Sequence, residues 1–79
     1  MREAFLIVMM PDKCFRERHY GTKQSAHDRA AEWLITFNHS RTAEQSGKQD
    51  AALVYRIKDF PGQTYGQIVS SGNYITKAT

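Results

Sequence analysis

Hydrophobic side chains are concentrated near the start of the chain, in residues 3–10, EAFLIVMM. After Glu3, both sets of alternating positions in this segment are apolar. A short run that is apolar on both faces is typical of a central strand, or of one that is covered on both sides. Pro11 and Asp12 then predict a turn. The pattern therefore predicts a buried strand over residues 3–10.

Residues 13–20, KCFRERHY, have a different pattern, because most of their side chains are charged or aromatic. In an extended conformation one face would hold Cys14, Arg16, Arg18 and Tyr20, and the other Phe15, Glu17 and His19. Neither face is cleanly apolar, so we expect an edge strand or an irregular arm. Charged side chains on an edge strand also oppose edge-to-edge aggregation.

The clearest helical pattern is in SAHDRAAEWLITFN, residues 25–38. Ser25 is a suitable N-cap residue, and Asp28 follows it at the spacing of a capping box. One helical face carries Ala26, Ala30, Trp33, Leu34 and Phe37, and the opposite side carries Arg29, Glu32 and Thr36. The pattern predicts a helix that packs across a sheet through Trp33 and Phe37.

A polar segment, NHSRTAEQSGKQD, covers residues 38–50 and has Ala43 as its one apolar residue. Connections longer than about 12 residues without secondary structure are uncommon in compact domains and are usually functional or disordered. We therefore expect a polar loop at 38–50, which is a second candidate contact element.

Three further strands are predicted after this loop. In AALVYRIKDF, residues 51–60, Leu53, Tyr55 and Ile57 would face the helix, and Val54, Arg56 and Lys58 would face away. PG predicts a turn, TYGQIV a strand, SSGN another turn and YITKA the last strand. The sequence thus predicts a single domain over residues 1–79 with an α+β fold. One helix would pack on one face of a mainly antiparallel sheet of about 4–5 strands, in the order β-(β)-α-β-β-β.

Composition and charge are those of an ordinary globular domain. The 79 residues are 41% hydrophobic and 24% charged, with a formal net charge of +3. The apolar run at residues 4–11 is shorter than the roughly 20 residues of a membrane helix, and no small-residue cleavage site follows it. The single cysteine, Cys14, forms no intrachain disulfide and favours a reducing compartment. We therefore expect a cytoplasmic protein that does not associate with membranes.

No residue pattern in the sequence predicts catalysis or a bound cofactor. The candidate zinc ligands lack the spacing of a zinc site: Cys14, His19, His27 and His39. Cys14 and His19 would lie on opposite faces of a strand, which separates a nucleophile from its base. A salt-bridged helix surface explains Asp28 and Glu32, with Arg29 between them. Since a glycine-rich phosphate loop is also absent, we predict a protein that is not an enzyme and holds no metal.

Without catalytic chemistry, we expect this chain to act by binding a macromolecule. The predicted contact surface is basic and aromatic: Arg16, Arg18, Tyr20, Arg56 and Lys58. Arginine and tyrosine are enriched at protein interfaces, so the first expectation is a protein partner whose site this chain blocks. The alternative is a nucleic-acid-binding domain that uses basic side chains and tyrosines of a sheet face. Self-association through the exposed face or an edge strand is a further option for so small a core.

The segment QIVSSGNYITK, residues 67–77, resembles the first inhibitory hairpin of the cystatins, which has a Gln-x-Val-x-Gly pattern followed by Asn-Tyr. The glycine is one residue late, at Gly72, and Ser71 takes its place. The resemblance covers a small part of the chain, and the inhibition of cysteine proteases that it implies is not carried over.

In length, mixed charge and the organisation of one helix on a sheet, the chain resembles phage-encoded inhibitors of host defence, anti-CRISPR proteins among them. This resemblance rests on architecture and not on a shared motif. It implies a protein that acts by covering a binding surface of its partner.

Overall fold

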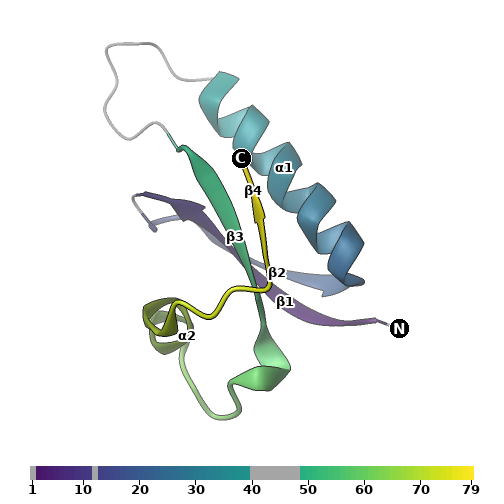
Figure 1. Ribbon diagram of the computed structural model, residues 1–79, viewed down its shortest axis with the longest axis vertical. Helices are drawn as coiled ribbons and strands as arrows, with labels where there is room; N and C mark the ends of the chain where they lie inside the picture. The colour runs from purple at the N-terminus through teal and green to yellow at the C-terminus, as the bar shows by residue number, and fades with distance from the viewer. Residues whose placement is uncertain (1, 12, 40–48) are drawn as a thin grey trace.

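The computed structural model describes residues 2–11, 13–39 and 49–79. Four antiparallel strands form one sheet in the order β2-β1-β3-β4: β1 (Glu3–Met10), β2 (Arg16–Gly21), β3 (Ala51–Arg56) and β4 (Thr76–Ala78). Helix α1 (Lys23–His39) packs on the sheet, and a 3-10 turn, η1 (Ile57–Asp59), precedes the short helix α2 (Tyr65–Ser71) (Figure 1). The predicted α+β fold is therefore confirmed. Within the described residues, neither helix has the length and apolar character needed to cross a bilayer.

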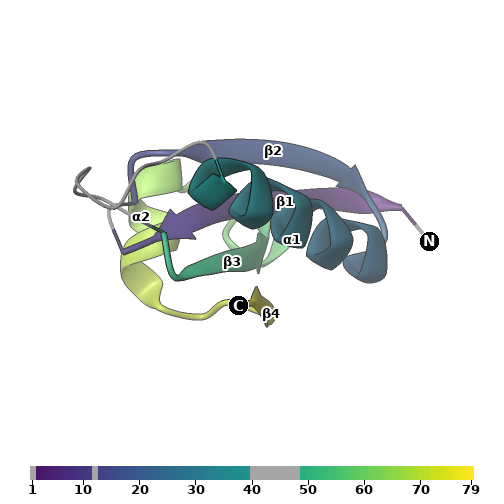
Figure 2. The same cartoon turned by 90° about the horizontal axis from the view of Figure 1, so that it is seen from above.

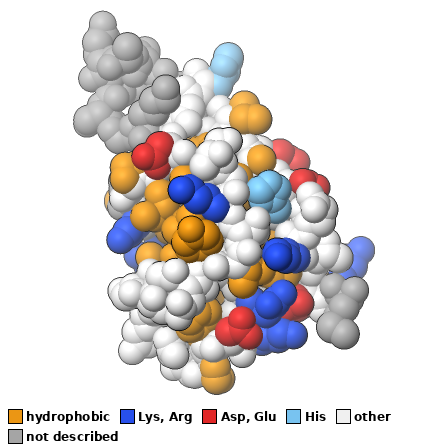
Figure 3. All heavy atoms as spheres, viewed as in Figure 1, with side chains coloured by type: hydrophobic (Ala, Val, Ile, Leu, Met, Phe, Trp, Pro, Cys, Tyr) orange, Lys and Arg blue, Asp and Glu red, His pale blue; other side chains and the backbone are white. Residues whose placement is uncertain are grey.

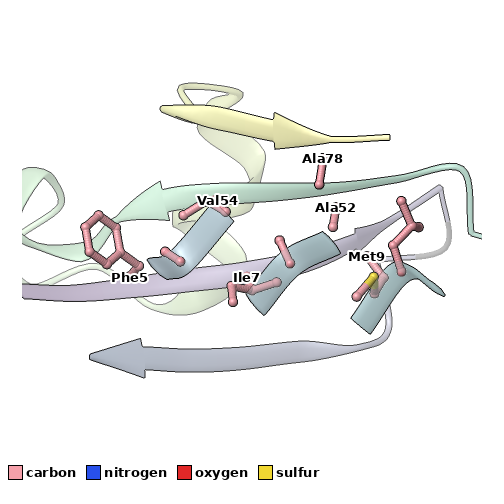
Figure 4. Close-up of a cluster of buried hydrophobic side chains, with 9 residues drawn as sticks. Phe5, Ile7, Met9, Ala52, Val54 and Ala78 are labelled. Atoms are coloured by element: carbon pink, nitrogen blue, oxygen red, sulfur yellow. The ribbon is translucent and has the colours of Figure 1, made fainter. Parts of the chain in front are cut away.

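The first hydrophobic core lies between the sheet and α1, as Figure 4 shows. The strands contribute Phe5, Ile7, Met9, Ala52, Val54 and Ala78, and the helix contributes Ala26, Ala30 and Leu34. Four of these nine residues are alanines, so the helix lies close to the sheet with little space to fill between them. The predicted apolar face of the helix is thus the face that packs on the sheet.

A second hydrophobic core lies on the other face of the sheet. Its buried members come from β1, β3, α2 and the segment between η1 and α2: Leu6, Val8, Leu53, Tyr55, Phe60, Ile68 and Val69. Because β1 contributes to both cores, each of its alternating faces is apolar. The residues from Phe5 to Met9 are accordingly all fully buried.

The sheet is therefore covered on both faces, whereas the sequence predicted one covered face and one open face. In β3, Val54 faces α1, while Leu53 and Tyr55 face α2, which reverses the predicted orientation of this strand. All five positions from Ala51 to Tyr55 are buried, so alternation of polar and apolar residues could not indicate which face meets α1. In β3 the smaller side chains, Ala52 and Val54, face α1, and the larger ones, Leu53 and Tyr55, face α2.

Helix α1 begins at Lys23, earlier than the predicted N-cap Ser25. The Thr22 hydroxyl oxygen accepts a hydrogen bond from the Ser25 backbone N–H at 3.0 Å. In return the Ser25 hydroxyl oxygen accepts one from the Thr22 backbone N–H at 2.9 Å. This reciprocal arrangement is that of a capping box, with Thr22 as the capping residue and Ser25 in the first turn.

Trp33 and Phe37 are half-buried at the edge of the first core and do not form its centre. Both pack on Phe15, which precedes β2, with ring centroids 4.8 Å and 4.9 Å away. They therefore close one end of the core and hold the start of β2 against α1. Leu34, which was predicted to share the core with them, is the one of the three that is buried.

The segment TYGQIV, which the sequence predicted to be a strand, lies largely in α2. Thr64 caps this helix through a complete capping box with Gln67, and Gly72 ends it in the left-handed region at φ 73°. Ile68 and Val69 point into the second core. The hairpin on which the resemblance to cystatins rested is consequently absent, because residues 67–71 are helical.

The predicted polar loop at 38–50 lies mainly outside the described residues. At its two ends, Asn38 belongs to α1, and Gln49 is fully buried just before β3. The Asn38 amide nitrogen donates to the Gln49 carbonyl at 2.5 Å, and the Asn38 amide oxygen accepts from the Gln49 N–H at 3.0 Å. One side chain thus fixes the end of α1 beside the start of β3.

Candidate functional site

Strand β2 lies at one edge of the sheet (Figure 2). Three of its alternate side chains are exposed to solvent. Arg16, Arg18 and Tyr20 are exposed, and 65% of Tyr20 is accessible. Arg18 is paired with Leu6 and Arg16 with Val8, so these side chains lie on the face of the sheet that bears α2. We refer to Arg16, Arg18 and Tyr20 as the β2 stripe.

The backbone of the stripe also faces outward. The Met9 N–H donates to the Phe15 carbonyl at 3.2 Å, which fixes the phase of the ladder between β1 and β2. In an antiparallel pair, residues that bond to the neighbouring strand alternate with residues whose N–H and C=O groups point away from it. The inward positions are therefore Glu17, His19 and Gly21, and the outward positions are those of the stripe. Among the described residues, no hydrogen bond reaches the outward backbone groups of the stripe.

The opposite side chains of β2 anchor the strand to α1. Glu17 accepts hydrogen bonds from Arg29 at 3.3 Å and from the Trp33 indole N–H. The hydrogen bond with Glu17 raises the pKa of Arg29 above its ordinary value, although desolvation opposes the shift. His19 Nε2 lies 2.8 Å from the Ser25 hydroxyl in the first turn of α1. The edge strand is thus fixed in place from its inner face.

The other arginines of the strands and helices are paired with carboxylates. Arg29 forms ion pairs with Glu17 and Glu32, both at 3.3 Å. Arg56 lies 2.7 Å from Glu3, and Glu3 is also 3.5 Å from Lys58. In contrast, Arg16 and Arg18 have no ion pair within the part of the chain that the structure describes.

The structure brings together only part of the predicted contact surface. Arg16, Arg18 and Tyr20 form one row, but Arg56 is opposite Phe5 on the α1 side of the sheet. Lys58 follows in η1 and shares Glu3 with Arg56. On the face shown in Figure 3, blue and red side chains lie next to each other in the lower part of the view, so the charges there are mixed. The unpaired positive charge of the predicted surface is therefore that of the β2 stripe.

A shallow hollow of about 340 Å³ lies at the C-terminal end of β2. Arg2 and Tyr20 both line it, together with Gly21 and Thr22. Arg2 therefore adds a third arginine beside the stripe, a residue that the sequence analysis did not select. Arg2 comes one position before Glu3, which pairs with Gly21 at the end of the β1–β2 ladder, and this place is the signal that was missed.

The Ser25–His19 pair is the arrangement closest to catalytic chemistry, and the sequence analysis missed it. The Ser25 hydroxyl also lies 3.0 Å from the Thr22 carbonyl, to which it donates, so it belongs to the helix cap. Among the described residues, no carboxylate is hydrogen-bonded to His19, and no three His, Cys, Asp or Glu side chains are grouped as metal ligands. Cys14 is exposed and precedes β2. The pair therefore has a structural explanation, which is to join β2 to α1.

Comparison of this chain with family models, curated proteins and solved structures gives no match. The functional interpretation accordingly rests on the geometry of the β2 stripe.

Proposed function

We propose that this protein binds another protein through the β2 stripe and blocks an acidic surface of that partner, without catalysing a reaction. One observation carries the proposal. Arg16 and Arg18 are exposed beside Tyr20 with no ion pair to a described carboxylate, while Arg29 and Arg56 are both neutralised within the fold. Arginine and tyrosine are among the residues that dominate binding energy at protein interfaces.

The size of the stripe favours a protein over a nucleic acid. From Arg16 to Tyr20 the strand extends about 14 Å, at about 3.4 Å per residue. Affinity for nucleic acid comes largely from many phosphate contacts, and Arg56 and Lys58 do not extend the stripe because they are paired with Glu3. A compact row of two arginines and one tyrosine suits the central contacts of a protein interface.

Nucleic-acid binding remains the second candidate because of one observation. Arg16 and Arg18 project from the same face as Tyr20, whose ring is accessible for stacking on an unpaired base. Binding of this kind weakens steeply with salt, since each phosphate contact releases counterions. A purified protein that binds an oligonucleotide with such a salt dependence would favour this candidate.

The more specific proposal is an inhibitor of the type that phages use against host defences, such as an anti-CRISPR protein. It is supported by the small α+β domain and by a contact surface that offers charge and shape only. A cytoplasmic location suits the lone cysteine, because thiols stay reduced there.

The test is affinity capture with charge-reversed variants. Arg16→Glu with Arg18→Glu reverses the charge of the β2 stripe. Lys23→Glu with Lys77→Glu gives the same change in net charge at exposed positions elsewhere. Each protein is used to capture partners from a nuclease-treated lysate of the host cell in which the protein acts. We expect one protein to be captured by the unchanged chain and by the lysine variant, and to be lost with the arginine variant. Capture that survives in both variants would reject the stripe as the contact surface.

A further inference from the structure

We infer that the outer edge of β2 accepts an extended acidic segment of the partner protein as an additional antiparallel strand of the sheet. This inference rests on the proposed function and specifies how the partner is held. In such strand addition, backbone hydrogen bonds supply affinity, and alternate side chains supply specificity.

The backbone of β2 is a suitable template for strand addition. It pairs with β1 over six consecutive residue pairs without interruption, so its outer edge is equally regular. The outward N–H and C=O groups belong to Arg16, Arg18 and Tyr20, as the phase of the ladder requires. The opposite edge of the sheet is formed by β4, which has only three residues. Strand β2, with six residues, therefore offers the longer edge for pairing.

The strand is also held in its extended conformation before any partner arrives. Glu17 and His19 attach its inner side chains to α1, through the hydrogen bonds to Arg29, Trp33 and Ser25. Gly21 packs so tightly that a Cβ atom there would lie 2.4 Å from the Ser25 hydroxyl. Because β2 is already ordered, less conformational entropy is lost when a partner strand binds to it.

The side chains of the stripe select an acidic segment. Residues directly opposite each other in an antiparallel pair have Cβ atoms about 4.5–5.5 Å apart, which favours opposite charges and disfavours like charges. An incoming strand would therefore place glutamate or aspartate side chains opposite Arg16 and Arg18. These arginines have no competing ion pair among the described residues.

The same rule argues against a second copy of this chain as the added strand. In a two-fold symmetric pairing of β2 with itself, the register with most overlap of the stripe is centred on Arg18. It would set Arg18 opposite the Arg18 of the other copy, and like charges at opposite positions are destabilising. Charged edge strands prevent self-pairing in this way, and an acidic segment avoids the penalty.

The experiment uses the full chain and a blocked octapeptide in which glutamate alternates with valine. In an antiparallel addition, the residues opposite the stripe have their backbone groups directed at β2, so the glutamates would supply the backbone hydrogen bonds. Two further peptides separate backbone pairing from charge attraction. One is N-methylated at every glutamate, and its matched control is N-methylated at every valine.

We expect the unmodified peptide and the valine-methylated peptide to bind with similar affinity. The glutamate-methylated peptide should bind at least about tenfold more weakly, because it lacks several hydrogen bonds. In amide hydrogen exchange measured by NMR, binding should slow the N–H groups of Arg16, Arg18 and Tyr20. Those of Glu17 and His19, which already bond to β1, should change little.

Each other outcome rejects strand addition. If both methylated peptides bind equally, the stripe attracts acidic groups through its side chains alone, and the proposed function remains while this inference fails. If no peptide binds, or sedimentation shows a dimer joined through β2, the edge does not accept an acidic segment. If an oligonucleotide slows exchange at the stripe and the peptides do not, the occupant is a nucleic acid.

Discussion

Substitution of Ile68 by alanine tests whether α2 covers the second face of the sheet. Ile68 is 1% exposed and packs in the second core with Leu6, Val8 and Tyr55. The substitution removes the Ile68 side chain beyond Cβ and leaves Val69 as the buried side chain of α2 in this core. If α2 truly covers that face, this small helix contributes a large share of the stability.

The expected loss follows from the buried hydrocarbon. At about 0.8 kcal/mol per buried CH₂ group, the missing atoms account for about 2.4 kcal/mol before any cavity forms. Buried isoleucine-to-alanine changes cost about 2–5 kcal/mol in practice, so we expect about 3 kcal/mol. A domain of this size has a total stability of about 4–12 kcal/mol, and each kcal/mol lowers Tm by about 4–8 °C.

Urea denaturation followed by circular dichroism gives the free energy of unfolding directly. The matched control is Ile35→Ala, because Ile35 lies in α1 but is 69% exposed. That variant should change the free energy of unfolding by less than about 0.5 kcal/mol. Equal effects of the two substitutions, or a loss below about 1 kcal/mol for Ile68→Ala, would show that α2 does not pack on the sheet.

Three further predictions concern single side chains. Gly21→Ala should destabilise the fold and speed amide hydrogen exchange at the N-terminus of α1, because the added Cβ would lie 2.4 Å from the Ser25 hydroxyl. An unchanged exchange rate at these amides would contradict this packing. Asn38→Ala should cost about 1–3 kcal/mol in urea denaturation, since the backbone of Gln49 loses both hydrogen bonds, whereas His39→Ala should cost little. Burial, with a smaller effect of Tyr74, raises the pKa of Tyr55 above 10, so the folded state keeps a proton that the unfolded state loses. Stability should therefore fall as pH rises above about 10, and Tyr55→Phe should reduce that fall; an unchanged pH profile would contradict it.

The elements with an unambiguous pattern could be predicted from the sequence. The doubly apolar run in β1 predicted a buried strand that is central or covered on both sides, and β1 is in fact buried by a core on each face. The helical face of Ala26, Ala30 and Leu34 packs on the sheet as expected. Residues 13–20 were predicted to form an edge strand or an irregular arm, and the structure has an edge strand at Arg16–Gly21 with Arg16 and Arg18 on one side.

Helix α2 was missed because its sequence contains two competing signals. Residues 64–69, TYGQIV, are rich in side chains that favour strands, and this composition suggested a hairpin. The capping box between Thr64 and Gln67 and the glycine at position 72 are signals for a short helix, and the structure follows these. Tertiary contacts of Ile68 and Val69 decide the outcome, because a helix this short is not stable in isolation.

Arg56 and Lys58 were wrongly placed in the contact surface for the same reason, because the sequence analysis did not predict α2. With one face of the sheet assumed to be open, Arg56 and Lys58 were assigned to the open face with the β2 stripe. The orientation of β3 depends on which face α1 covers, and the sequence of a strand buried on both sides does not reveal it. Ion pairing was equally invisible, since Glu3 and Arg56 are neighbours only after β1 pairs with β3.

Isothermal titration calorimetry of the captured partner against three chains tests most directly whether β2 carries the binding surface. We expect Arg16→Glu with Arg18→Glu to weaken binding at least about 100-fold, because each central arginine contributes about 2 kcal/mol or more. Lys23→Glu with Lys77→Glu, at equal net charge, should bind within about threefold of the unchanged protein, as expected of peripheral charges. Equal affinities for all three chains, or equal losses in the two variants, would contradict a binding surface at β2.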